Sequence, residues 1–177
     1  LDNPVTEDYG KRCLLARRLV EQGVRFVQVY MNSQPWDTHS NNAANLRNLT
    51  ARTDQPAAAL VADLEQRGLL DSTIVMFTGE FGRLPVSQGA DGRDHNRRAF
   101  SLWLAGGGFR GGYTHGSTDE FGYEASEDVV TVHDLHATLM HTLGLDHRRL
   151  DFPHAGRRER LTDPDVTGAR VVNELLA

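Results

Sequence analysis

The order of the expected secondary-structure elements predicts an α/β protein. Three apolar runs, at residues 24–31, 72–79 and 99–108, are rich in side chains favoured in β-strands. Helical periodicity lies before the first run, between the first and the second, and after the third. A chain in which helices and strands alternate in this way folds as a sheet covered by helices. Because 177 residues suffice for one ordinary core, we expect a single domain over residues 1–177.

The first helix and the first strand are predicted between residues 8 and 31. Leucine, alanine and valine recur at helical spacing over residues 8–22, and Gly23 follows as a helix stop. The run VRFVQVYM at 24–31 is almost continuously apolar, which is typical of a strand covered on both faces in a parallel or mixed sheet. Cys13 is the only cysteine and shares the apolar stripe of the helix, so we expect a core thiol and no disulfide.

The alternation continues through the rest of the chain. Asp54 is placed to cap a second helix through PAAALVADLEQR, Gly68 to end it, and STIVMFTG to form a second buried strand. AFSLWLAGGG is expected to form a third strand that runs into a glycine turn. Thr131 and Asp134 have the spacing of a capping box at the start of a third helix, which Gly144 ends.

Composition excludes two classes of partner. The 24 acidic and 19 basic residues give a net charge of −5, which argues against a general nucleic-acid binder. No apolar run approaches the roughly 20 residues of a membrane-spanning helix. The chain starts without methionine and without a secretory signal, so we expect a portion of a longer protein. A sheet edge left exposed in such a portion would favour a homo-oligomer.

Three polar clusters lie beside the predicted strands: WDTH, TGEFGR and GRDHN. Ligands of α/β sheets gather beyond the carboxyl ends of the strands, where loops converge. The clusters supply carboxylates and imidazoles, the mixture that zinc or manganese accepts. We therefore expect a shared divalent-metal site with the ligands Asp37, His39, Glu80, Asp94 and His95.

Each cluster also has a purely structural interpretation. Asp37 is suited to cap a helix that begins near Ser40. Glu80 is spaced to form an ion pair with Arg83, and residues 94–96 have the composition of a polar turn. In that case the chain would be a structural module that binds no metal.

Several of these segments resemble a known family. The order of STIVMFTGEFGR, DHN, AFSLWLAGGGFRGG and VTVHDLHATLMHTLGLD is similar to the C-terminal half of the alkaline phosphatase and sulfatase superfamily. More closely, YGKRCLLARRLVEQGVRFVQVY, WDTHSNN, TGEFGR, GRDHN and TDEFGY resemble the bacterial sulfatase-like family called domain of unknown function 1501. The resemblance covers nearly the whole chain. It implies the C-terminal half of a three-layer αβα sandwich with a mostly parallel sheet.

The resemblance also implies roles for individual residues. Asp37 and His39 take the place of ligands to one metal, His95 completes that site, and Glu80 takes the place of an acidic ligand to a second metal. The pattern departs from the superfamily at Glu80-Phe81, where Asp-His is usual, so Asp94 is an alternative ligand or the site holds one ion. The superfamily's nucleophile would lie upstream of this chain.

The implied activity is metal-dependent hydrolysis of a phosphate or sulfate ester. Zinc is the expected ion, with manganese, calcium and magnesium as alternatives, and the substrate class is a small-molecule or carbohydrate ester. Arg83 and Arg97 are candidates for binding the ester oxygens in fork geometry, with His115 as a further candidate. The alternative is a non-catalytic module that binds anionic sugars or a partner protein. Members of the family typically carry a twin-arginine export signal, which implies a periplasmic or secreted full-length protein.

Overall fold

Helix α1 (Glu7–Glu21) forms where the leucine and alanine periodicity predicts it. It belongs to a computed structural model that describes residues 3–177. Cys13 lies on the buried face of α1 with Ala16 and Arg17, which confirms the core thiol. Burial raises the pKa of this thiol to about 11, so the unreactive protonated form prevails at neutral pH.

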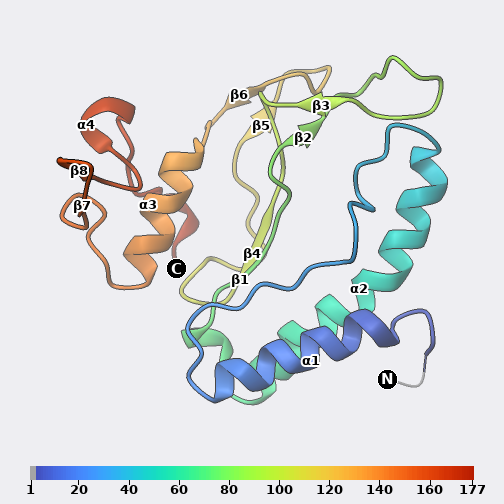
Figure 1. Cartoon of the computed structure of the whole chain (residues 1–177), viewed down its shortest axis with the longest axis horizontal. Helices are drawn as coiled ribbons and strands as arrows, with labels where there is room; N and C mark the ends of the chain where they lie inside the picture. The colour runs from blue at the N-terminus through green and yellow to red at the C-terminus, as the bar shows by residue number, and fades with distance from the viewer. Residues whose placement is uncertain (1–2) are drawn as a thin grey trace. The chain divides into compact units, whose positions relative to one another are not determined.

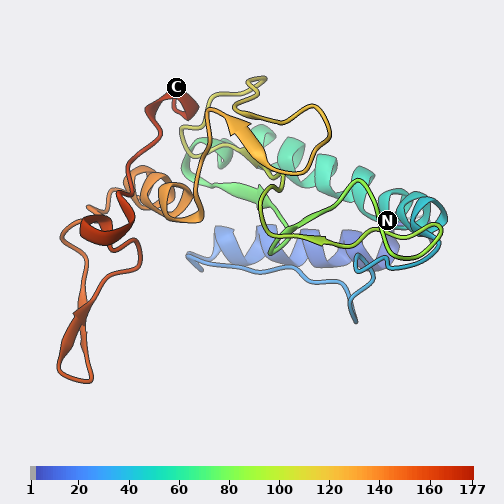
Figure 2. The same cartoon turned by 90° about the horizontal axis from the view of Figure 1, so that it is seen from above.

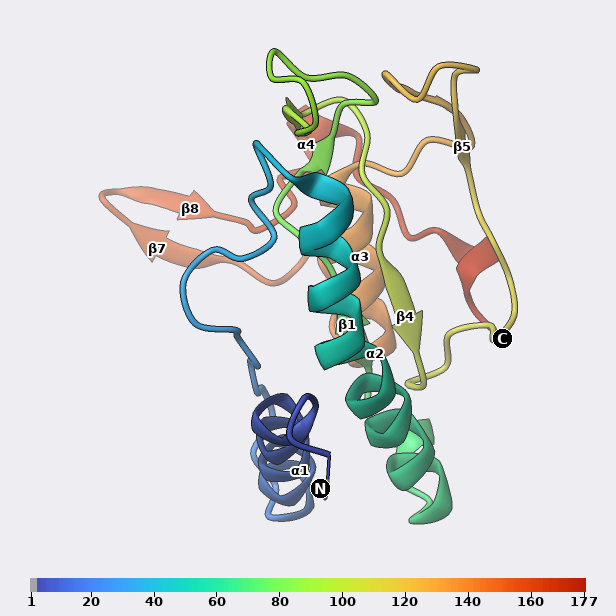
Figure 3. The ribbon, with the colours of Figure 1, turned by 90° about the vertical axis from the view of Figure 1, so that its right-hand side faces the viewer.

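Helix α2 (Asn42–Gln66) is longer than predicted. It begins well before Asp54, so the prediction that Asp54 caps it is wrong; the N-cap residue is Asn41. Pro56 lies inside the helix, although proline is best tolerated in a first turn. Because a proline removes one backbone hydrogen bond, it explains why α2 changes direction near its middle (Figure 3). The predicted end is confirmed, with Gly68 at φ +67° just beyond it.

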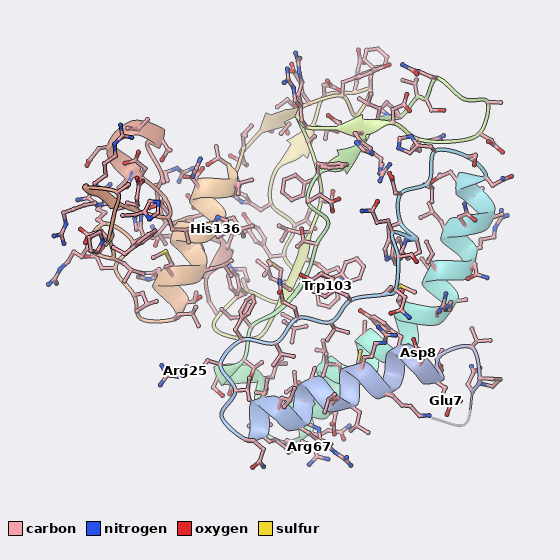
Figure 4. The ribbon with its side chains drawn as sticks, in the orientation of Figure 1. Glu7, Asp8, Arg25, Arg67, Trp103 and His136 are labelled. Atoms are coloured by element: carbon pink, nitrogen blue, oxygen red, sulfur yellow. The ribbon has the colours of Figure 1, made fainter. Side chains whose placement is uncertain are left out.

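Helices α1 and α2 pack against each other (Figure 1). The buried side chain of Arg17 pairs with carboxylates of both helices. Arg17 is only 7% exposed and forms ion pairs with Glu21 on its own helix and Asp63 on α2. Its Nε atom lies 2.8 Å from Asp63 Oδ2, without the alignment of a hydrogen bond. Arg67, at the end of α2, donates to Asp63 at 2.8 Å and approaches Glu21 at 3.3 Å (Figure 4). Charge pairing therefore joins the two helices at this end.

The segment 24–31 is not the buried strand that its apolar run predicts. It is extended and runs alongside α1 (Figures 1 and 2), but it pairs with no strand among residues 3–177. Phe26 is 77% exposed and Tyr30 is 66% exposed. The Tyr30 carbonyl accepts a hydrogen bond from the Arg12 side chain at 2.6 Å, where a strand would offer a backbone N–H.

The strands of the structure are short, and every pair of them is antiparallel. Two pairs are β1 with β4 and β2 with β3, and the other two are hairpins, β5 with β6 and β7 with β8. Their bounds are β1 Val75–Phe77, β2 Gly82–Arg83, β3 His95–Asn96, β4 Trp103–Ala105, β5 Ser117–Thr118, β6 Ala125–Glu127, β7 Phe152–His154 and β8 Arg157–Glu159.

The predicted three-layer αβα sandwich with a mostly parallel sheet is therefore wrong. The described residues contain four α-helices and only two-stranded antiparallel sheets. Of the strands predicted at 72–79 and 99–108, only the three-residue strands β1 and β4 form, and they pair with each other. An apolar run shows that a segment suits a buried strand, but it does not supply the neighbouring strands that a parallel sheet requires.

The chain divides into two compact units. Unit 1 comprises residues 3–70 and 79–101, with α1, α2, β2 and β3. Unit 2 comprises residues 71–78 and 102–177, with the other strands, α3 (Val132–Thr142) and the single-turn α4 (Pro164–Thr167). Single-domain organisation stays a prediction. Within residues 3–177, no helix combines the length and the apolar character needed to cross a membrane.

Unit 2 is organised around α3 and the C-terminal tail. The predicted capping box is confirmed: Thr131 Oγ1 accepts from Asp134 N at 3.1 Å, and Asp134 Oδ2 accepts from Thr131 N at 2.9 Å. Asp134 also accepts from Arg170 N, and the buried Thr138 hydroxyl accepts from Val172 N at 3.0 Å. Polar groups on one face of α3 thus hold the tail in place.

Trp103 stacks on Phe77 across β1 and β4 (Figure 4).

Candidate metal centre

Asp37, His39 and His95 meet at one point of unit 1, although His95 is 58 residues from Asp37 in the sequence. Asp37 Oδ1 lies 3.1 Å from His39 Nε2 and 3.0 Å from His95 Nε2. The two Nε2 atoms are 3.1 Å apart, and the ring centroids are 4.9 Å apart. Three potential ligand atoms therefore form a nearly equilateral triangle.

A close backbone approach between two loops brings the histidines together. Arg93 N donates to Thr38 O at 3.0 Å, which joins the loop before His95 to the loop that carries His39. Gly92 lies against the His39 backbone so closely that a Cβ atom there would be 2.0 Å from the His39 carbonyl oxygen. Only a residue without a side chain fits at this position. Glycine in GRDHN is thus part of the construction of the site.

The pairing of β2 with β3 places an arginine and an aromatic ring beside the triangle. Arg83 is directly opposite His95 in the register. Its Nη2 atom donates to Asp37 Oδ1 at 2.6 Å, and its Nη1 atom donates to Arg93 O at 3.4 Å. The Phe81 ring packs on the His95 ring with centroids 4.3 Å apart, and Arg83 lies over the same phenyl ring.

Asp37 is held in its charged form. Hydrogen bonds from His95 and Arg83 lower the pKa of this carboxyl to about 2. At neutral pH the centre therefore contains a carboxylate, two imidazoles and a guanidinium. The side chains of His39, His95 and Asp37 are 50%, 48% and 33% exposed, so the centre is open to solvent.

The remaining predicted ligands are placed differently. Asp94 Oδ1 lies 3.5 Å from Nδ1 of His39, on the opposite side of the ring from the triangle. Glu80 is exposed. In the described residues, 3–177, it does not belong to the cluster of Asp37, His39 and His95, whose potential ligand atoms lie close enough together to share a metal ion. Arg97 is exposed in unit 1, and His115 belongs to unit 2, where its Nδ1 atom lies 3.3 Å from the Tyr113 hydroxyl. Metal ligation itself stays a prediction.

The structural interpretations of the clusters explain little of this geometry. Asp37 does not cap α2, which has Asn41 as its N-cap residue. Arg83 directs its described hydrogen bonds to Asp37 and Arg93 O. Sequence reasoning missed the packing of Phe81 on His95, for which the motif contains no evident signal.

The donor set fits a divalent transition metal. Two imidazole nitrogens and one carboxylate oxygen, with a further position open, are ligands that catalytic zinc sites use. Tetrahedral bonds of about 2.05 Å separate neighbouring donors by roughly 3.3 Å, close to the spacing of these three atoms. Two Nε2 atoms at 3.1 Å need a proton between them, whereas one cation would satisfy both lone pairs and the carboxylate.

Comparison with known proteins identifies a family. The family model described as a protein of unknown function, DUF1501, matches residues 1–176. Neither the curated proteins nor the solved structures contain a match. Because the family model spans nearly the whole chain, the protein belongs to the DUF1501 family.

Proposed function

We propose that the protein binds one divalent metal ion, best zinc, at Asp37, His39 and His95 and hydrolyses phosphate or sulfate esters. The observation that carries the proposal is the convergence of the three ligand atoms at spacings of 3.0 to 3.1 Å. The resemblance to sulfatase-like proteins supplies the reaction class. The described ligands suit one ion, and Glu80 has no part in the proposal.

The residues around the ion have distinct tasks in this proposal. A bound zinc ion would act as a Lewis acid that stabilises charge developing on the ester oxygens. Asp37 and the two neutral imidazoles hold the ion. Arg83 lies beside them and donates to Asp37 and Arg93 O, which leaves further N–H groups of its fork for the oxygens of a phosphate or sulfate group.

A second candidate is a metal-dependent binding module without turnover. The half-exposed histidines favour it, because hydrolytic sites gain from excluding water. Its ligand would be an anionic sugar or an acidic surface of a partner protein, held by the metal and Arg83.

Metal content and ester hydrolysis test both candidates. Wild type is expected to hold zinc at about one equivalent by inductively coupled plasma mass spectrometry, and His39→Ala and His95→Ala are expected to lose it. His154→Ala, an exposed histidine of unit 2, serves as the matched control and should keep the metal.

Hydrolysis is then assayed with p-nitrophenyl phosphate and p-nitrophenyl sulfate on the same variants of the full-length protein, because the resemblance implies a nucleophile upstream of these residues. Zinc-dependent turnover that falls in Arg83→Met supports the hydrolase, and zinc binding without turnover supports the binding module. A wild-type protein that binds no metal above background would contradict both.

A further inference from the structure

We propose that Asp94 is a positioning residue that holds His39 with its Nε2 atom directed at Asp37 and His95, and is not itself a ligand. The assignment rests on the proposed metal site and deepens it. Asp94 Oδ1 faces Nδ1 of His39 at 3.5 Å, whereas Nε2 of the same ring faces Asp37 at 3.1 Å. The two carboxylates thus lie at opposite nitrogens of one imidazole.

His39 needs such a partner because its neutral ring has one proton and two places for it. Asp37, at Nε2, attracts the proton to the nitrogen whose lone pair a metal requires. A carboxylate at Nδ1 attracts it to the other nitrogen and leaves the Nε2 lone pair free. Histidine ligands commonly donate their second ring N–H to a carboxylate, and Asp94 Oδ1 lies within ion-pair distance of Nδ1, at 3.5 Å. Asp94 therefore favours the tautomer that can bind metal.

Packing alone does not orient the His39 ring. Its side chain is 50% exposed, and its described ring contact is with His95, the other candidate ligand. The orientation therefore depends on the polar contacts at its two nitrogens.

Asp94 is itself held by the backbone around it. Its Oδ2 atom accepts from Gln88 N at 2.8 Å, and its carbonyl oxygen accepts from Leu84 N at 2.8 Å. The next residue is His95, so one short segment supplies both a ligand and the group that orients the other histidine. With Oδ2 engaged by Gln88 and Oδ1 facing Nδ1, both carboxylate oxygens of Asp94 point to partners outside the triangle.

The test compares Asp94→Asn with Asp91→Asn in the full chain. Asp91 is an exposed aspartate of the same loop, and its described hydrogen bond is made by its backbone, whose carbonyl oxygen accepts from Asn42 N. It therefore controls for the loss of one charge. Zinc affinity is measured by competition with a chromophoric chelator. Asp94→Asn is expected to weaken zinc binding about 10- to 100-fold while saturating zinc still reaches the wild-type stoichiometry. Asp91→Asn should match wild type, and Asp94→Glu, which keeps the charge, should recover part of the loss.

A second measurement does not depend on any variant folding. Nitrogen-15 NMR of the zinc-loaded wild type should show His39 protonated at Nδ1 and bound through Nε2. A metal bound through Nδ1, or equal zinc affinities for Asp94→Asn and Asp91→Asn, would overturn the assignment and leave the metal site intact. Loss of stoichiometry in Asp94→Asn to the level of His39→Ala would make Asp94 a ligand. A wild type without zinc would overturn the proposed function first and this assignment with it.

Discussion

At the scale of single residues, Asp37 is the charge on which the centre depends. Its Oδ1 atom accepts a hydrogen bond from Arg83 and lies beside Nε2 of both histidines. These contacts lower the pKa of the Asp37 carboxyl to about 2. A carboxyl with a lowered folded-state pKa contributes stability above its unfolded pKa and loses it as pH falls through the folded value. The contribution of Asp37 is therefore complete above about pH 5 and disappears between about pH 4 and pH 2.

Asp37→Asn tests this pH dependence. The variant should melt at a lower temperature than wild type at pH 6, because Arg83 and the histidines lose their charged partner. The difference in Tm should shrink as pH falls from 4 to 2 in metal-free buffer. Thermal denaturation followed by circular dichroism measures it, and a difference that stays constant down to pH 2 would refute the role of the Asp37 charge.

Gly92→Ala tests the close approach of the two loops. A Cβ atom 2.0 Å from the His39 carbonyl oxygen forces the loops apart, so we expect weaker zinc binding and a loss of about 1–3 kcal/mol in the free energy of unfolding. Gly111→Ala is the control, because nothing lies within 4 Å of its Cβ position. Urea denaturation and zinc titration measure the two effects. Equal behaviour of the two variants would show that the approach is not needed.

At the scale of elements, the pair α1 and α2 combines apolar packing with one buried cation. Arg17 is covered by the helices and balanced by Asp63 and Glu21. A cation in such a position helps specify how two helices meet, and removing it leaves Arg67, at the exposed end of α2, as the remaining described cation beside the two carboxylates.

Arg17→Met is expected to lower the free energy of unfolding by about 2 kcal/mol, because among the described residues Asp63 and Glu21 then keep only the more exposed Arg67 as a cationic partner, and this loss outweighs the gain from an apolar side chain. Lys11→Met is the control: Lys11 pairs with Glu7 on the exposed surface of α1 and should change stability little. Urea denaturation of both variants provides the comparison. A stabilised Arg17→Met protein would mean that the desolvation free energy of the buried guanidinium exceeds the stabilisation that its ion pairs provide.

At the scale of the whole molecule, the candidate centre and its supporting elements all belong to unit 1. The triangle, Arg83, Phe81, Gly92 and Asp94 lie within residues 37–95 of that unit. A metal that binds the folded unit and not the unfolded chain stabilises the fold by mass action.

Zinc at 100 times its dissociation constant should therefore stabilise the wild type by about 2.7 kcal/mol. The rise in Tm should be absent in His95→Ala and retained in the control His154→Ala. Scanning calorimetry with and without zinc measures it, and a chelator should reverse it. An equal rise in all three proteins would point to zinc binding elsewhere.

Local features of this fold could be predicted from sequence because they depend on neighbours in the chain. Helix α1, the capping box of Thr131 and Asp134, and the buried Cys13 each depend on spacings of a few residues. The segment 24–31 shows the limit, because its composition suits a buried strand whereas its partners are decided elsewhere. The same holds for Asp54. Its position suits a helix cap, but α2 begins at Asn42, so Asp54 lies inside the helix.

The sequence by itself determined helix α1, the capped start of α3, the net charge and the polar residues from which a metal centre could be built. Only the tertiary structure decided that Asp37, His39 and His95 meet while Glu80 stays apart, and that the strands pair two by two in antiparallel fashion. The physical reason is distance along the chain. A helix closes its hydrogen bonds within four residues, whereas Asp37 and His95 are 58 residues apart and meet only because the backbone at Gly92 packs against that at His39.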